Sequence, residues 1–200
     1  FRRVLFRSKV HVPRLDKEAR RHFLEKIKAL PSAGSLDVES LLDDTSGMTG
    51  AEMEQIQRQI GMCLIKNGGT EISTEQAEDI IAIIRYGERT GIHKDEENRR
   101  RVAIHEAGHA IVAMSLKPSR IIERITITSR GNMGGFVKFD EDQRLLKTPQ
   151  NILNEMAICL GGRCAQLLLD EINGMDEGAA NDLEQVTLYA YLACTKLGFD

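Results

Sequence analysis

Two histidines one helical turn apart are the feature that most restricts how this chain can fold. His105 and His109 lie in a segment from about Asn98 to Leu116 that has helical spacing of apolar residues and is halted by Pro118. The apolar residues that share the histidine face are Val102, Val112, Ala113 and Leu116. Both imidazoles should therefore point into a core, where unpaired polar rings are costly unless they are hydrogen-bonded or bind a metal ion.

The run His105-Glu106-Ala107-Gly108-His109 matches the pattern His-Glu-x-x-His, whose two histidines can share one metal ion. Glu106 would lie beside a zinc-bound water and take its proton as the water attacks a peptide carbonyl. Zinc would lower the pKa of this water to about 7. The alternative is a chance match on an ordinary helix, but the inward direction of both rings favours a metal. We therefore predict zinc ligands at His105 and His109, and a general base at Glu106.

A catalytic zinc site needs a third protein ligand and one open position. Four acids near the last predicted helix compete for this role: Asp176, Glu177, Asp182 and Glu184. On a helix that starts at about Asn181, the apolar stripe comprises Leu183, Val186, Tyr189, Ala190 and Ala193. Asp182 falls within this stripe, whereas Glu184 faces the other way. Asp182 is therefore the predicted third ligand.

The first 90 residues predict a small helical domain, because apolar residues recur with helical spacing in short segments separated by turns. Capping-box patterns open two of these segments, Thr49 with Glu52 and Ser73 with Gln76. The polar stretch from residue 87 to 98 lacks periodicity, and it marks the expected domain boundary.

The second half of the chain predicts helices around a small sheet. Residues 121–128 alternate as in a strand, and Gly131-Asn132 predicts a turn into a second strand at 135–139. Thr148-Pro149 opens a further helix, and a last helix follows Gly178. The expected fold class is mainly α (α+β), with a helical domain followed by a mostly helical domain that carries the sheet.

Composition excludes several other classes of protein. The net charge of -3 arises from 27 basic and 30 acidic residues mixed along the chain, so no nucleic-acid partner is expected. Uninterrupted apolar runs are far shorter than the roughly 20 residues of a membrane-spanning helix, so we expect a soluble piece. The N-terminus lacks a Met and a signal peptide, as in a chain cut from a longer one. Four cysteines among apolar residues predict buried thiols in the cytosol.

The predicted second strand is also a candidate substrate-binding edge. A protease can hold an extended substrate by pairing it with a sheet edge through main-chain hydrogen bonds, which depend little on the substrate's sequence. The expected contacts are Gly135, Phe136 and Val137. The alternative is a plain hairpin strand whose glycines serve only the turn.

With these residues in place, the chain resembles the FtsH family of membrane-tethered AAA zinc metalloproteases. In that family His-Glu-Ala-Gly-His is followed by a Gly-Ala-x-Asn-Asp segment that supplies the third zinc ligand, which here is Gly178 to Asp182. The run Gly161-Gly162-Arg163-Cys164-Ala165 is similar to the family's Gly-Gly-Arg-x-Ala, and Ile125-Thr126-Ile127 with Arg130-Gly131 also matches. The resemblance thus implies the same ligand, Asp182, as the helix face does.

The resemblance extends upstream. Gly47 to Glu52, followed by Ile72 to Glu75, is similar to the helical lid of the family's ATPase module. Phe1-Arg2-Arg3 resembles the family's Phe-Asp-Arg, although Arg2 replaces its aspartate, and Arg3 would then be an arginine finger. The implied domains are an ATPase lid at 1–90, with the end of the ATPase core at 1–14, and a zincin-type peptidase domain at 95–200 that is truncated at its C-terminus.

The family resemblance implies an ATP-dependent zinc endopeptidase that degrades unfolded, membrane and cytosolic proteins. Because the sequence has no Gly-x-x-x-x-Gly-Lys-[Ser/Thr], ATP and Mg²⁺ would bind only in a longer parent. That parent would be a homo-hexamer tethered through a missing N-terminal segment, at the cytosolic face of a bacterial inner membrane or in an organellar membrane.

Two other functions compete with this interpretation. The chain could be a catalytically silent oligomerisation or regulatory module of an AAA protein, but it keeps His105, Glu106, His109 and Asp182 together. It could also be a zinc hydrolase of another substrate class, which the similarity to an ATPase lid disfavours.

Overall fold

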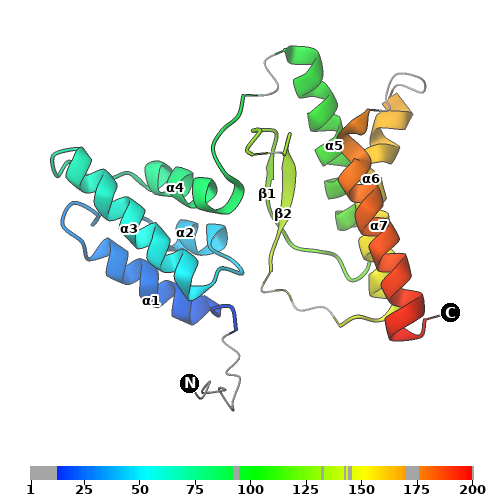
Figure 1. The fold of residues 1–200 in the computed structure, drawn as a ribbon, viewed down its shortest axis with the longest axis horizontal. Coiled ribbons are helices and arrows are strands. Elements are labelled where there is room, and N and C mark those ends of the chain that lie inside the picture. The colour runs from blue at the N-terminus through cyan, green and yellow to red at the C-terminus, as the bar shows by residue number, and fades with distance from the viewer. Residues whose placement is uncertain are drawn as a thin grey trace, which may run out of the picture. The chain divides into compact units, whose positions relative to one another are not determined.

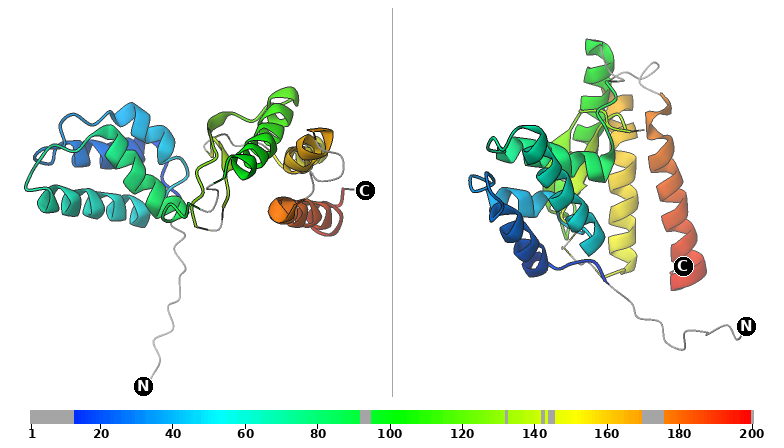
Figure 2. Two further views of the ribbon diagram at one scale, coloured as in Figure 1. Left: turned by 90° about the horizontal axis from the view of Figure 1, so that it is seen from above. Right: turned by 60° about the vertical axis from the view of Figure 1, so that its left-hand side comes forward.

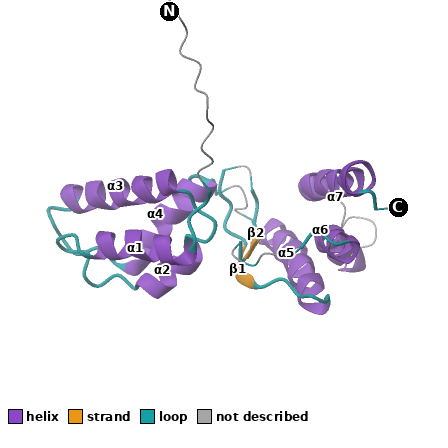
Figure 3. Ribbon diagram, turned by 90° about the horizontal axis from the view of Figure 1, so that it is seen from below, coloured by secondary structure: helices purple, strands orange, loops and turns teal. Residues whose placement is uncertain are grey.

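The structure is a computed structural model that describes residues 13–91, 95–131, 133–141, 143, 146–169 and 176–199. Helices form nearly all of its regular structure, and one small antiparallel sheet accompanies them (Figures 1 and 3), so the expected mainly α (α+β) class is confirmed. Contacts divide the chain into two compact units between Ile80 and Ile81. The assignment of 1–90 as an ATPase lid and of 95–200 as a peptidase domain stays a prediction, and Arg3 lies outside the described residues.

The first unit is a set of short helices around an apolar core. Its elements are α1 (Lys17–Lys28), α2 (Val38–Asp44), α3 (Gly50–Lys66) and the start of α4 (Thr74–Tyr86). Both predicted capping boxes are present. The Thr49 hydroxyl accepts from the Glu52 N–H while the Glu52 carboxylate accepts from the Thr49 N–H, and Ser73 and Gln76 exchange the same pair of bonds. The largest fully buried apolar side chains of this core include Leu24, Ile27, Leu41, Met53, Ile56 and Ile60.

The second unit has three long helices side by side and a hairpin. Its elements are α5 (Glu96–Ser115), β1 (Ile122–Thr126), β2 (Phe136–Phe139), α6 (Pro149–Leu169), a 3-10 turn η1 (Glu177–Ala179), α7 (Ala180–Leu192) and a π-helical turn η2 (Ala193–Leu197). Helix α6 packs against α5 on one side and against α7 on the other, as Figure 2 shows. Because α6 lies between them, α5 and α7 both contact α6.

Two glycines let α5 and α6 approach each other closely. A Cβ atom on Gly161 would lie 2.7 Å from the main-chain oxygen of Gly108, and a Cβ atom on Gly108 would clash with the Gly161 carbonyl group. Neither position has room for a side chain, so the two backbones are in direct contact there. This contact fixes how the histidine-bearing turn of α5 lies on α6.

The hairpin has a register that is disturbed at one place. Ile125 pairs with Val137 and Thr126 with Phe136, and a bulge separates the pairs of Ile122 and Arg124. Beyond the strand end, the Asp140 N–H donates to the Ile121 carbonyl at 2.9 Å. The main-chain groups of Asp140 therefore face the β1 side. Because these groups alternate sides along a strand, those of Val137, three residues earlier, point away from β1, toward the other edge of β2.

Helix α6 is long and apolar enough, by length and composition, to cross a membrane. Its apolar residues are not one uninterrupted run, which is why the sequence did not predict a span. Buried polar side chains at Asn154 and Gln166, together with helices packed on two of its sides, are typical of a core helix instead. We interpret α6 as part of the core of the second unit.

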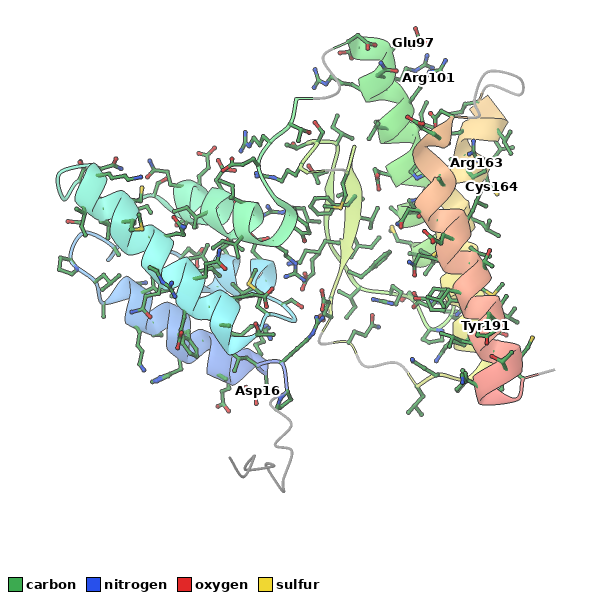
Figure 4. All side chains as sticks on the ribbon, viewed as in Figure 1. Asp16, Glu97, Arg101, Arg163, Cys164 and Tyr191 are labelled. Atoms are coloured by element: carbon green, nitrogen blue, oxygen red, sulfur yellow. The ribbon has the colours of Figure 1, made fainter. Side chains whose placement is uncertain are left out.

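The expectation that all four cysteines are buried is wrong, because none of them is fully buried and two are exposed. Cys164 on α6 and Cys194 in η2 are exposed, while Cys63 and Cys159 are partly buried. Figure 4 labels Cys164 next to Arg163 on α6. The neighbouring residue Ala165 faces α5 at Gly108. Successive residues of an α-helix are rotated by 100°, so Cys164 points away from the contact between α5 and α6.

Candidate metal centre

Helix α5 supplies three of the predicted site residues. The Asp95 carboxylate caps its first turn by accepting from the Asn98 N–H at 2.8 Å. His105 and His109, one turn apart, are both buried, and their rings meet edge to face with centroids 4.6 Å apart. Their Nε2 atoms are 3.0 Å apart. The buried histidine face that the sequence predicted is therefore present.

Helix α7 supplies the third donor in its first turn. The Asp182 Oδ2 atom lies 3.0 Å from Nε2 of His105 and 3.4 Å from Nε2 of His109. Of the four acids considered, Asp182 is the one in this cluster, while Glu184 is exposed. Among the described residues, His105, His109 and Asp182 are the group whose donor atoms could hold a metal ion together.

The predicted inward face of α7 includes Asp182 in the structure, but one residue assigned to that face, Leu183, does not lie on it. Leu183, expected on the buried stripe, is 44% exposed. The inward face of α7 begins at Asp182 and continues through partly buried residues, which are Gln185, Val186, Tyr189 and Ala190. One residue along a helix is a 100° rotation, which turns Leu183 away from α6.

The tautomers of both histidines suit a cation. The Ile158 carbonyl, which can only accept, lies 2.7 Å from Nδ1 of His109, so that nitrogen carries the hydrogen. For His105, the Gln166 side-chain oxygen lies 3.4 Å from Nδ1. The two Nε2 lone pairs then face each other and a carboxylate. Three acceptors that converge without a donor need a shared proton or a cation between them.

The spacing of the three donor atoms also fits zinc. Zinc–nitrogen bonds of about 2.0–2.1 Å in tetrahedral geometry place neighbouring ligand atoms about 3.3 Å apart. The three donor–donor distances here are 3.0, 3.0 and 3.4 Å. Two histidines and a carboxylate form one of the donor sets of catalytic zinc sites, which keep a fourth position for water or substrate.

Charges inside the cluster shift its pKa values. Burial alone would raise the pKa of Asp182, but hydrogen bonds from His105 and His109 and their charges lower it to about 2. Burial alone would lower the pKa of His109, but the Asp182 carboxylate and the Ile158 carbonyl raise it above its usual value. Without a cation, the cluster therefore holds a proton on the histidine side and keeps Asp182 ionised.

Glu106 lies on α5 next to this cluster and is 6% exposed. Burial raises the pKa of its carboxyl group above the usual value, although nearby His109 and His105 partly oppose the shift. A Cβ atom on Gly135 would lie 3.0 Å from its Oε1 atom, so the residue that precedes β2 packs against the Glu106 carboxylate. The predicted base and the predicted substrate strand thus meet at one place.

The other two predicted substrate contacts lie on β2. The Phe136 ring packs against Tyr86, with centroids 4.2 Å apart, so its side chain has a structural partner. The main-chain groups of Val137 point toward the edge that is not paired in the described part of the chain. This edge offers backbone hydrogen-bonding groups a short distance along the strand from Glu106.

Three residues support the site in ways that were not predicted, although Asp176 was one of the four acids considered as a third ligand. A Cβ atom on Gly162 would lie 2.5 Å from Cε1 of His105, so the α6 backbone supports the ring directly. Gln166 contacts Nδ1 of His105, and Asp176 accepts a hydrogen bond from Gln166 at 3.1 Å. The paired glycines inside a helical pattern were a signal of close backbone approach. No sequence pattern indicates what Gln166 contacts.

Comparison with known proteins gives consistent relatives. Residues 92–200 match Peptidase family M41. The chain is 32% identical over 169 residues to "ATP-dependent zinc metalloprotease FtsH 3" of Phytoplasma mali, an alignment that covers 83% of the chain and 28% of the relative. It is 32% identical over 197 residues to "ATP-dependent zinc metalloprotease FtsH 1" of Sorangium cellulosum, covering 96% of the chain and 32% of the relative. The chain therefore spans about a quarter to a third of the length of the relatives that it matches.

Proposed function

Because this chain belongs to peptidase family M41, we propose that it contains the peptide-cleaving zinc centre of an ATP-dependent metalloprotease. The observation that carries the proposal is the convergence of three acceptors, Nε2 of His105, Nε2 of His109 and Oδ2 of Asp182, beside the buried Glu106. Such a cluster is costly without a cation. Its donor set and its neighbouring carboxylate are those that metal-assisted hydrolysis requires.

His105, His109 and Asp182 would hold the zinc ion, which supplies Lewis acidity to a peptide carbonyl and to a water molecule. Glu106 takes a proton from the water as its oxygen bonds to the carbonyl carbon, and returns the proton to the nitrogen as the C–N bond breaks. Burial supports this role, since it moves the pKa of Glu106 upward toward neutral pH, where a general base works best.

We propose that an extended substrate pairs with the outer edge of β2 from Gly135 to Val137. The main chain of Val137 faces this edge, and Gly135 packs against Glu106. Pairing through main-chain groups would tolerate many side chains, as a protease of unfolded proteins needs. In a peptide-cleavage assay, Val137→Pro should raise KM because it removes the outward N–H, whereas Val137→Ala keeps that N–H. Unchanged cleavage by folded Val137→Pro would rule the pairing out.

For a longer parent, we propose binding of ATP and Mg²⁺, assembly as a homo-hexamer, a membrane tether, and cleavage of unfolded membrane and cytosolic proteins. The names of the relatives, ATP-dependent zinc metalloproteases, support the ATP dependence. The similarity of residues 1–90 to an ATPase lid supports this proposal. Arg3 remains a proposed arginine finger on the residue pattern alone.

The decisive experiment measures zinc content and casein cleavage in the full-length parent with ATP. Glu106→Gln should keep zinc, because Glu106 is not one of the donors, and should lose cleavage about 10²- to 10⁴-fold, the usual contribution of a general base. Glu184→Gln, an exposed acid on α7, is the matched control and should cleave as the wild type does. A wild-type parent that binds zinc and ATP but cleaves nothing would instead indicate the silent oligomerisation module.

A further inference from the structure

We propose that Gln166 and Asp176 form a hydrogen-bonded pair that positions two of the metal donors, His105 and Asp182. The inference rests on the proposed zinc centre. The pair connects the last turn of α6 to the 3-10 turn that precedes α7. Neither residue reaches the donor cluster as a ligand, so both are positioning residues.

The pair determines which way the Gln166 amide faces. Gln166 is 5% exposed, and its Nε2 donates to Oδ2 of Asp176 at 3.1 Å. An ionised carboxylate has no hydrogen to donate, so Asp176 can bond only to the NH₂ side of the amide. The amide oxygen must then face Nδ1 of His105, which lies 3.4 Å away.

This orientation has a direct consequence for the histidine. An amide oxygen opposite Nδ1 selects the tautomer of His105 that carries its hydrogen on Nδ1. The Nε2 lone pair is then free and points at Asp182 and His109. Asp176 therefore acts on the metal donor through Gln166 without touching the ring.

The same carboxylate also holds the start of α7. The other oxygen of Asp176, Oδ1, accepts from the Gly178 N–H at 2.8 Å and so caps the 3-10 turn. The main-chain oxygen of Asp176 accepts from the Arg163 guanidinium on α6 at 2.7 Å. Asp182 follows in the first turn of α7. One residue thus links the support of His105 to the position of the third donor.

Either single substitution should disturb this orientation, and exchanging both side chains should restore the order of donors and acceptors. In Asp176→Asn, the new amide can donate to the Gln166 oxygen, which frees the Gln166 NH₂ to face Nδ1 of His105 and selects the wrong tautomer. In Gln166→Glu, two carboxylates face each other and repel. In the double variant, the carboxylate at 166 accepts both from Nδ1–H of His105 and from the amide at 176. The donor–acceptor order is then restored.

The test is the zinc dissociation constant of the 200-residue chain, measured by competition with a chromophoric chelator. Asp176→Asn should weaken zinc binding about 10- to 100-fold in the wild-type background, the usual cost of losing a partner of a metal-bound histidine. In the Gln166→Glu background the same substitution should tighten binding by about tenfold or more. Glu177→Gln, an exposed neighbouring acid, should change neither.

The sign reversal separates positioning from a purely structural role. If Asp176 only capped the turn, Asp176→Asn would weaken zinc binding in both backgrounds, and that result would overturn the proposal. Equal affinities of the wild type and Asp176→Asn would overturn it too. Far-UV circular dichroism and thermal midpoints of the zinc-free variants show that folding is retained. A wild-type chain that binds no zinc would refute the proposed centre itself, which is a different result.

Discussion

Gly162 and the imidazole of His105 face each other so closely that a Cβ atom at position 162 would lie 2.5 Å from Cε1 and 2.7 Å from Nδ1 and Nε2 of the ring. The ring therefore rests against the backbone of α6 rather than against a side chain. Because the Gln166 side-chain oxygen also faces Nδ1 from the same helix, α6 contacts both the ring and one nitrogen of this proposed metal donor.

Gly162→Ala should displace His105 and weaken zinc binding by about tenfold or more, since no atom of the ring can stay within 3 Å of a new methyl group. Gly61→Ala is the matched control. It is also a glycine inside a helix, but a Cβ atom there would meet nothing within 4 Å. The control should bind zinc as the wild type does. Its free energy of unfolding should rise by about 0.5–1 kcal/mol, because Ala is a better helix former than Gly. Wild-type zinc affinity in Gly162→Ala would show that the His105 ring can bind zinc from a position away from residue 162.

The predicted site residues that the structure brings together share one property: their direction follows from local helical geometry. His105 and His109 are four residues apart, so a helix alone puts them on one face. The position of Asp182 required only the face of its own helix, and its meeting with the histidines is what the structure adds. Both capping boxes were likewise local patterns, each spanning four residues.

What the sequence did not reveal depends on which helices pack together. Gln166 lies 61 residues from His105, and its contact exists only because Gly108 and Gly161 bring α5 and α6 into backbone contact. Leu183 was assigned to the buried stripe of α7 by its spacing, but the contact with α6 lies one residue further around the helix. Such rotations are set by the tertiary contact rather than by apolar spacing.

Asp182→Ala should weaken zinc binding by more than about 100-fold, because losing a ligand should cost more than the 10- to 100-fold cost of losing a partner of a ligand. Glu184→Ala is the control, since it removes an acid two residues away that is exposed and faces away from the histidines. Chelator competition gives both constants. Equal affinities of the two variants would mean that Asp182 is not a donor.

Thr49→Ala should destabilise the first unit by about 1 kcal/mol, because the capping box at the start of α3 loses the acceptor for the Glu52 N–H. For a unit of this size that corresponds to a fall of roughly 4–8 °C in its Tm. Glu54→Ala, an exposed residue one turn further along the same helix, should leave the Tm unchanged. Zinc affinity should stay at the wild-type value in both variants, since the metal donors all lie in the second unit. Calorimetry of the zinc-free chain would contradict the prediction if Thr49→Ala and Glu54→Ala had the same Tm.

Zinc affinity should fall as the pH is lowered, because zinc competes with a proton for His109. In the zinc-free chain the pKa of His109 is raised, because the Asp182 carboxylate and the Ile158 carbonyl outweigh the effect of burial. Zinc must displace that proton, so below this pKa each pH unit should weaken binding about tenfold, and above it the affinity should level off. Asp182 adds no slope near neutral pH, because its pKa is about 2. Dissociation constants between pH 6 and 9, corrected for protonation of the chelator, test this. An affinity that stayed constant down to pH 6 would mean that no proton leaves His109 when the metal binds.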